Sequence, residues 1–248
     1  EDIFGLNIRS LRTIRTLFQK PADYFTAAKS QDWAFFRYTP SPRLWLGLIA
    51  LTVATRFIWG ISDGRFMDSL AQQAQAGFEA GAGDSADKLP PIDWSAVIER
   101  SFDVALLAQP FLMLAMMLFL ATFIRFWGEA LPYVVRVRYL FGIIIPATVV
   151  NFGLTFLVLF MPNGAIGVVS IAQLALMLGL YALTAAQGPF RNETADSRIP
   201  KSIMLAIILF IAVMITNFIA QGIGIVLELI PTILHAIEAA ESAAQASP

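Results

Sequence analysis

Long apolar stretches separated by short polar segments dominate the pattern of this chain. They fall at residues 44–61, 104–124, 139–161, 165–186 and 202–230. A helix of about 20 apolar residues is long enough to cross the hydrocarbon core of a bilayer, so each stretch can form one span. The pattern predicts an all-α fold, namely a polytopic membrane helix bundle with five transmembrane helices.

Residues 1–42, ahead of the first span, follow a different period. Apolar side chains alternate with Arg9, Arg12 and Arg15, which are spaced three apart on one helical stripe. The spacing predicts an N-terminal amphipathic interfacial helix that binds the membrane surface through these arginines, although a helix packed on protein with solvated arginines fits nearly as well. We expect the aromatic side chains that follow to anchor the segment among lipid headgroups: Tyr24, Phe25, Trp33, Phe35, Phe36 and Tyr38.

The remaining residues, 43–248, form the predicted five-span domain, which contains an acidic outer loop at 62–103. Within the loop we expect a helix at 66–78 and a flexible linker, rich in Gly, Ala and Asp, at 77–87. Asp93 is well suited to cap the N-terminus of a further helix.

Basic residues are sorted between the two ends of the predicted spans. Of the 17 lysines and arginines, 13 fall on the side of the N-terminus if the five spans are correct, whereas only Arg65, Lys88 and Arg100 fall on the other side. Because basic loops stay in the cytoplasm, we expect a bacterial inner (cytoplasmic) membrane protein with a cytoplasmic N-terminus and a periplasmic C-terminus.

Composition narrows the classes of partner and cofactor. With 57% hydrophobic and 14% charged residues, a soluble globular domain is excluded. The lipid bilayer is therefore the first expected partner, with bound lipids and other membrane protein subunits, and no nucleic acid. The chain has no cysteine and one histidine, so we expect no metal site and no cofactor bound by this chain alone.

Polar side chains inside apolar spans are costly and therefore mark candidate sites. On the last span, Asn217, Gln221 and Glu228 share one helical face. They could line a polar path, or they could form an interhelical hydrogen-bond network worth about 1 kcal/mol per bond, and we expect the network. For Arg56 we expect a structural role, with its side chain reaching the interface or an acidic partner. The full candidate set is Arg56, Gln109, Asn151, Gln173, Asn217, Gln221 and Glu228.

Small residues form a stripe on the fourth predicted span. Ala175, Gly179, Ala182 and Ala186 recur at helical spacing. Such a stripe lets two helix backbones approach closely. We expect close helix packing there, either within the bundle or with a partner.

No catalytic constellation can be assembled from the sequence. A nucleophile with a base, a carboxylate pair on one face of a span and a metal site are all missing, and His235 lies beyond the last span. We therefore predict that the protein is not an enzyme and has no catalytic residues.

The entry to the first span carries a family resemblance. A basic helix, Pro21, the aromatic segment and the element Arg37-Tyr38-Thr39-Pro40 precede the spans. In this the chain resembles the bacterial five-span proteins related to the Yip-domain family, and a neighbouring uncharacterised family of multi-pass membrane proteins. The resemblance implies a five-span topology and carries over no active-site residue.

These observations favour a non-catalytic accessory or scaffold subunit of a larger membrane complex, of the respiratory or photosynthetic type. The alternative is a small-solute or ion transporter or channel that uses the polar stripe of the last span. A third hypothesis is a lipid-handling or membrane-shaping role for the basic N-terminal helix.

Overall fold

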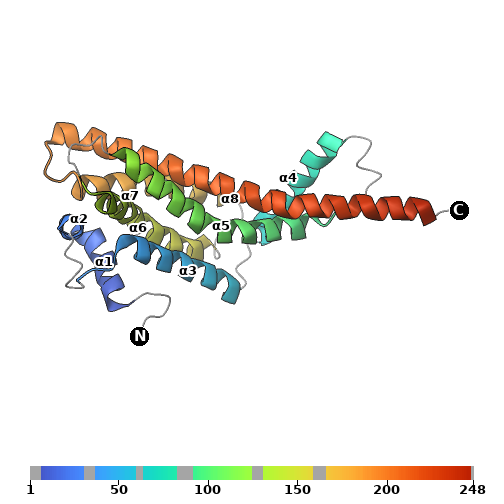
Figure 1. Ribbon diagram of the computed structural model, residues 1–248, viewed down its shortest axis with the longest axis horizontal. Helices are drawn as coiled ribbons and strands as arrows, with labels where there is room; N and C mark the ends of the chain where they lie inside the picture. The colour runs from blue at the N-terminus through green and yellow to red at the C-terminus, as the bar shows by residue number, and fades with distance from the viewer. Residues whose placement is uncertain are drawn as a thin grey trace. The chain divides into compact units, whose positions relative to one another are not determined.

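The computed structural model describes residues 7–30, 37–59, 64–82, 92–124, 131–158 and 166–246. Within these ranges only the backbone is described for residues 56–59, 64–70, 73, 82, 155–158, 166–170, 236 and 239–246. The described residues form helices and no strand, which confirms the predicted all-α class. The helices (Figure 1) are α1 (Ile8–Gln19), α2 (Pro21–Lys29), α3 (Ser41–Trp59), α4 (Gly64–Ala82), α5 (Trp94–Phe123), α6 (Tyr133–Val158), α7 (Ile166–Gln187) and α8 (Ala195–Ala246).

The chain divides into two compact units. Unit 1 comprises Glu1–Trp59 and Met113–Met214, and unit 2 comprises Gly60–Leu112 and Ile215–Pro248. Helices α5 and α8 therefore each contribute residues to both units.

Helix α6 is the centre of unit 1 and contacts α1, α2, α3 and α7 (Figure 1). Residues 140–147 of α6 are all buried, so this part is enclosed around its whole circumference, and Ile143, Ile144 and Ile145 are each at most 1% exposed. A helix that is apolar on all sides is typical of a position enclosed by other helices. Trp45 of α3 packs its ring against that of Phe141 on α6, with 5.2 Å between the ring centroids.

Helix α1 is bound to the segment that leads into α3. The Asn7 side chain caps its N-terminus by accepting hydrogen bonds from the backbone N–H groups of Arg9 and Ser10. The buried hydroxyl of Thr13 accepts a 2.9 Å hydrogen bond from the backbone N–H of Thr39. One face of α1 is thus packed on protein, as the second interpretation of its sequence requires, while Arg9, Arg12 and Arg15 stay exposed.

Helix α2 is inserted into unit 1. Tyr24 and Phe25 are at most 2% exposed, and the Tyr139 hydroxyl of α6 donates a 3.1 Å hydrogen bond to the Phe25 carbonyl. The Phe25 ring lies against Gly188, where an added Cβ atom would collide with it. The aromatic residues of this segment were expected among lipid headgroups, but Tyr24, Phe25 and Tyr38 are buried in the core, because α2 folds back onto α6 and α7. Trp33, Phe35 and Phe36 lie outside the described residues.

In unit 2, α5 and α8 approach each other backbone to backbone. A Cβ atom at Gly224 would collide with the carbonyl group of Ser101. Ser101 and Ala105 on α5 and Ala220 and Gly224 on α8 are all buried, and each pair is spaced by four residues. This close approach needs small side chains on both helices. The small-residue stripe predicted from the sequence lies on α7, and these two pairs were not predicted.

Three helices in the described part of the chain are long and apolar enough to span a membrane. They are Trp94–Phe123, Tyr133–Leu154 and Ala195–His235, whereas Ile171–Gln187 is shorter. These three lie at the predicted spans 104–124, 139–161 and 202–230. By length and composition, three of the five predicted spans are thus candidate membrane-spanning helices in the part of the chain that the structure describes.

The expected outer loop agrees with the structure at Asp93 and differs from it in the expected linker. Helix α5 begins at Trp94, and the Asp93 side chain caps it, as predicted, by accepting a 3.1 Å hydrogen bond from the Ala96 N–H. Helix α4 continues through Gly77 and Gly81 to Ala82, so the first part of the expected linker is helical. Residues 83–91 lie outside the described residues.

Candidate functional site

The polar stripe of α8 is partly engaged by a neighbouring helix in unit 2. The Gln109 amide of α5 donates a 2.7 Å hydrogen bond from Nε2 to the Oδ1 atom of Asn217. Gln221, one turn further along α8, is exposed, and Glu228 is half-buried. The amide of Asn217 is therefore used in holding two helices together.

A second amide pair joins α6 and α7 in unit 1. Gln173 donates a hydrogen bond from Nε2 to Oδ1 of Asn151, and both side chains are half-buried. The two pairs contain four of the seven polar residues in the candidate set predicted from the sequence. The side chain of a fifth, Arg56, lies outside the described residues, and its backbone belongs to α3.

The small-residue stripe of α7 faces open space at its centre. Ala175 and Gly179 are exposed, and no atom of the described residues lies within 4 Å of the position that a Cβ atom would take at Gly179. Ala182 and Ala186 are half-buried. Leu176 and Leu183 beside the stripe are exposed as well, so this face of α7 is an exposed apolar surface.

A cavity of about 410 Å³ lies in unit 1 between α2, α6 and the segment that joins α7 to α8. Aromatic and aliphatic side chains form most of its walls, including Phe25, Tyr139 and Phe190. Its polar lining is Thr26, Lys29, Arg136, Asn192 and Glu193. Mostly apolar walls with a few polar groups are typical of small-molecule sites.

Arg136, which lines this cavity, caps the C-terminus of α5. It is 7% exposed, and its guanidinium donates hydrogen bonds to the carbonyls of Ala121 at 2.7 Å and Leu131 at 3.1 Å. The last carbonyls of a helix have no partner within the helix and carry partial negative charge, so a guanidinium satisfies them well. From the sequence, Arg136 is only one of the 13 basic residues predicted on the side of the N-terminus, because the carbonyls that it caps come close to it only in three dimensions.

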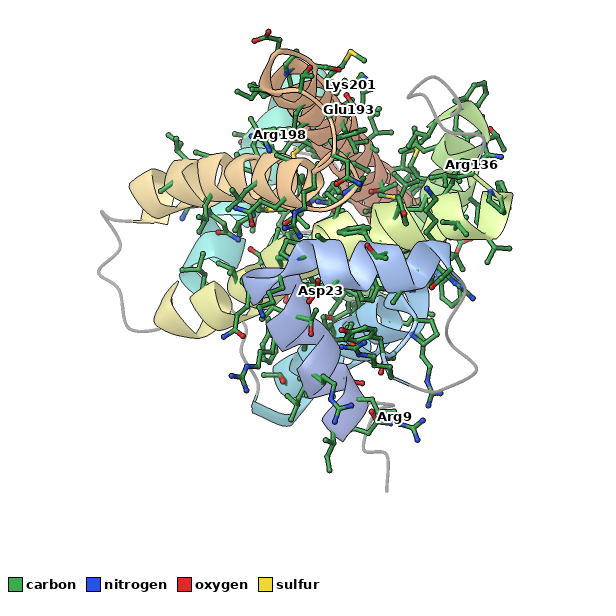
Figure 2. All side chains as sticks on the ribbon, turned by 90° about the vertical axis from the view of Figure 1, so that its left-hand side faces the viewer. Arg9, Asp23, Arg136, Glu193, Arg198 and Lys201 are labelled. Carbon is green, nitrogen blue, oxygen red and sulfur yellow. The ribbon has the colours of Figure 1, made fainter. Side chains whose placement is uncertain are left out.

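Glu193, at the same cavity, holds the start of α8. Its carboxylate accepts a 2.7 Å hydrogen bond from the Lys201 ammonium and a 2.5 Å hydrogen bond from the Ser197 hydroxyl. Figure 2 shows Glu193 and Lys201 side by side, with Arg136 on a different helix. The hydrogen bond from Lys201, followed by that from Ser197, lowers the pKa of Glu193. Both Arg136 and Glu193 are therefore already engaged in holding helix ends.

Metal ligands and the histidine complete the candidate chemistry of the described residues. Among them, no group of three or more His, Asp or Glu side chains lies close enough to hold a metal ion. His235 and Glu238 face each other at 3.6 Å on the exposed surface of α8. Comparison of the chain with models of protein families, with curated proteins and with solved structures found no match.

Proposed function

We propose that the protein is a non-catalytic integral membrane protein that acts as an accessory or scaffold subunit of a larger membrane complex, of the respiratory or photosynthetic type. In this proposal the chain crosses a bacterial inner membrane five times, with a cytoplasmic N-terminus and a periplasmic C-terminus. The separation of basic residues along the sequence supports that orientation.

The observation that carries the proposal is the exposed stripe of small residues on α7. Between helices in a membrane there is little hydrophobic driving force, so association depends on close packing and small residues at the contact. Ala175 and Gly179 provide such a surface, and within the described residues nothing fills the space above Gly179. A transmembrane helix of another subunit is the partner that fits this surface.

The amide pairs support a structural role over a conducting one. One side-chain hydrogen bond joins Gln109 to Asn217, and another joins Gln173 to Asn151. Amides paired in this way contribute about 1 kcal/mol to helix association and leave little polarity for a solute.

The first test is a pull-down of the tagged chain from its native membrane in mild detergent, followed by mass spectrometry and an absorption spectrum. We expect partner proteins in stoichiometric amount, and the bands of a haem or pigment held by those partners. A colourless chain that elutes alone would contradict the proposal.

A pair of variants locates the contact. Gly179→Leu places a bulky side chain on the small-residue stripe of α7 and should abolish copurification of the partners. Gly153→Leu is the matched control, because Gly153 on α6 is also exposed, with no atom within 4 Å of its Cβ position, but belongs to no small-residue stripe. Equal loss of partners in both variants would remove α7 as the docking helix.

The second candidate function is a small-solute or ion transporter or channel. It is favoured by Gln221 and Glu228, which leave an amide and a carboxylate exposed or half-buried on a membrane-spanning helix, where polar groups are costly. In proteoliposomes, Glu228→Gln should then abolish a solute flux that the unmodified chain supports. The scaffold proposal expects no flux from either protein.

A further inference from the structure

Two neighbouring hollows on unit 1 collect basic side chains from four segments of the chain. The first has a volume of about 390 Å³ and is lined by Arg12 and Arg15 of α1, by Lys20 and by Arg37. The second, of about 480 Å³, is lined by Lys20, by Arg191 and by Arg198 at the start of α8. Both hollows also share Gln19 and Asp23, so they meet at the junction of α1 and α2.

The positive charge of these hollows is hardly neutralised by the protein. Asp23 is the one acidic side chain that lines either of them, against six lysines and arginines. In the part of the chain that the structure describes, no carboxylate forms a salt bridge with any of the six. In Figure 2, Asp23 lies between Arg198 and Arg9. Like charges held close together repel one another, and a bound anion relieves that repulsion.

The residue types indicate what kind of anion fits. Five of the six cations are arginines, whose planar guanidinium donates paired hydrogen bonds to phosphate oxygens. Beside them, α1 exposes Leu11 at 68% and Phe18 at 43%. A ligand that satisfies both features carries a phosphate group next to apolar chains.

We propose that these two hollows form a binding site for the phosphate group of an anionic phospholipid. The arginines of both hollows bind the headgroup, while the exposed apolar side chains of α1 contact the acyl chains. This site differs from a general attraction of the arginines of α1 to the membrane, because it also includes Arg191, between α7 and α8, and Arg198, at the start of α8. A bound lipid would thereby tie the N-terminal helices to the start of α8.

The test uses the full chain in maltoside micelles with three probes, which are dihexanoyl phosphatidylglycerol, dihexanoyl phosphatidylcholine and inorganic phosphate. Binding is followed by isothermal titration and by the shift of the thermal unfolding midpoint. We expect phosphatidylglycerol to bind and to raise the unfolding midpoint. The other two probes should bind at least tenfold more weakly, an affinity difference on the order of that from losing one hydrogen bond to a charged group. Equal binding of inorganic phosphate would overturn the assignment to a lipid, and binding of none of the probes would overturn the site.

Variants separate the site from general charge effects. Arg37→Gln and Arg191→Gln, one from each hollow, should each weaken phosphatidylglycerol binding about tenfold. Arg100→Gln removes the same charge from an exposed position on α5 and should leave the affinity unchanged. If Arg191→Gln does not fold, Arg198→Gln tests the second hollow in its place. Equal losses in the Arg100 variant and the hollow variants would refute the proposal.

Discussion

The ring of Phe25 occupies the space that a Cβ atom at Gly188 would need, so α2 and the end of α7 are in contact without any intervening side chain. Gly142 on α6 borders the same ring, with its Cβ position 3.1 Å from the Phe25 Cε1 atom. Two glycines, Gly142 on α6 and Gly188 directly after α7, thus make room for one aromatic side chain of a helix that precedes the first predicted span. This contact is the reason that α2 belongs to the core of unit 1.

Replacement of Gly188 tests this contact. We expect Gly188→Ala to lower the free energy of unfolding by about 1–3 kcal/mol, because the added methyl group overpacks the core against Phe25. The control is Gly179→Ala, where the methyl group meets no atom and alanine favours the helix, so stability should be unchanged or slightly higher. Both are measured by denaturant titration in micelles.

The double variant Phe25→Leu/Gly188→Ala extends this test. A smaller side chain at position 25 leaves room for the methyl group, so the double variant should lose less stability than the sum of the two single variants. Additive losses would show that the two positions do not interact.

The hydrogen bond between Gln109 and Asn217 should appear as a coupling energy. We expect Gln109→Leu and Asn217→Leu each to destabilise the protein, and the double variant to recover about 0.6–1 kcal/mol relative to the sum. Gln221→Leu, at an exposed position of the same helix, should have little effect. A coupling of zero in this double-mutant cycle would argue against the hydrogen bond.

The close approach of α5 and α8 predicts different tolerance at two nearby glycines. Gly224→Leu must push α8 away from the Ser101 carbonyl, so we expect loss of several kcal/mol of stability, or failure to accumulate in the membrane. Gly222→Leu enters open space and should be tolerated. The two variants are compared by their yield in the membrane and by their resistance to proteolysis. Equal values for both variants would exclude the close approach of α5 and α8.

Glu193 predicts a pH dependence at the start of α8. Its pKa is lowered in the folded protein from the usual value of 4.5, so its bond to Lys201 stabilises the fold above that pH and is lost as the pH falls through the folded pKa. For a surface ion pair we expect at most about 1 kcal/mol. Glu193→Gln should remove this part of the acid dependence of the unfolding midpoint, whereas Glu99→Gln, at an exposed position of α5, should retain it.

The sequence alone predicted the all-α class and the positions of the three helices that are long and apolar enough to span a membrane. Both follow from local properties, because helix length and hydropathy along one segment decide whether it can cross a bilayer. The helix cap at Asp93 is local in the same way and was also predicted. The amides that pair were recognised as a set, since any amide in an apolar span needs a partner.

Only the tertiary structure decided which surfaces meet. Gln109 pairs with Asn217 and Asn151 with Gln173, the close approach lies at Ser101 and Gly224, and the stripe around Gly179 stays open. In water an apolar face identifies the side of a helix that is buried, but in a bilayer lipid and protein interior are equally apolar, so periodicity does not distinguish them. For the same reason the sequence predicted that Tyr24 and Phe25 anchor the chain among lipid headgroups. In the structure both side chains are buried in the core, where Gly142 and Gly188 leave space for them.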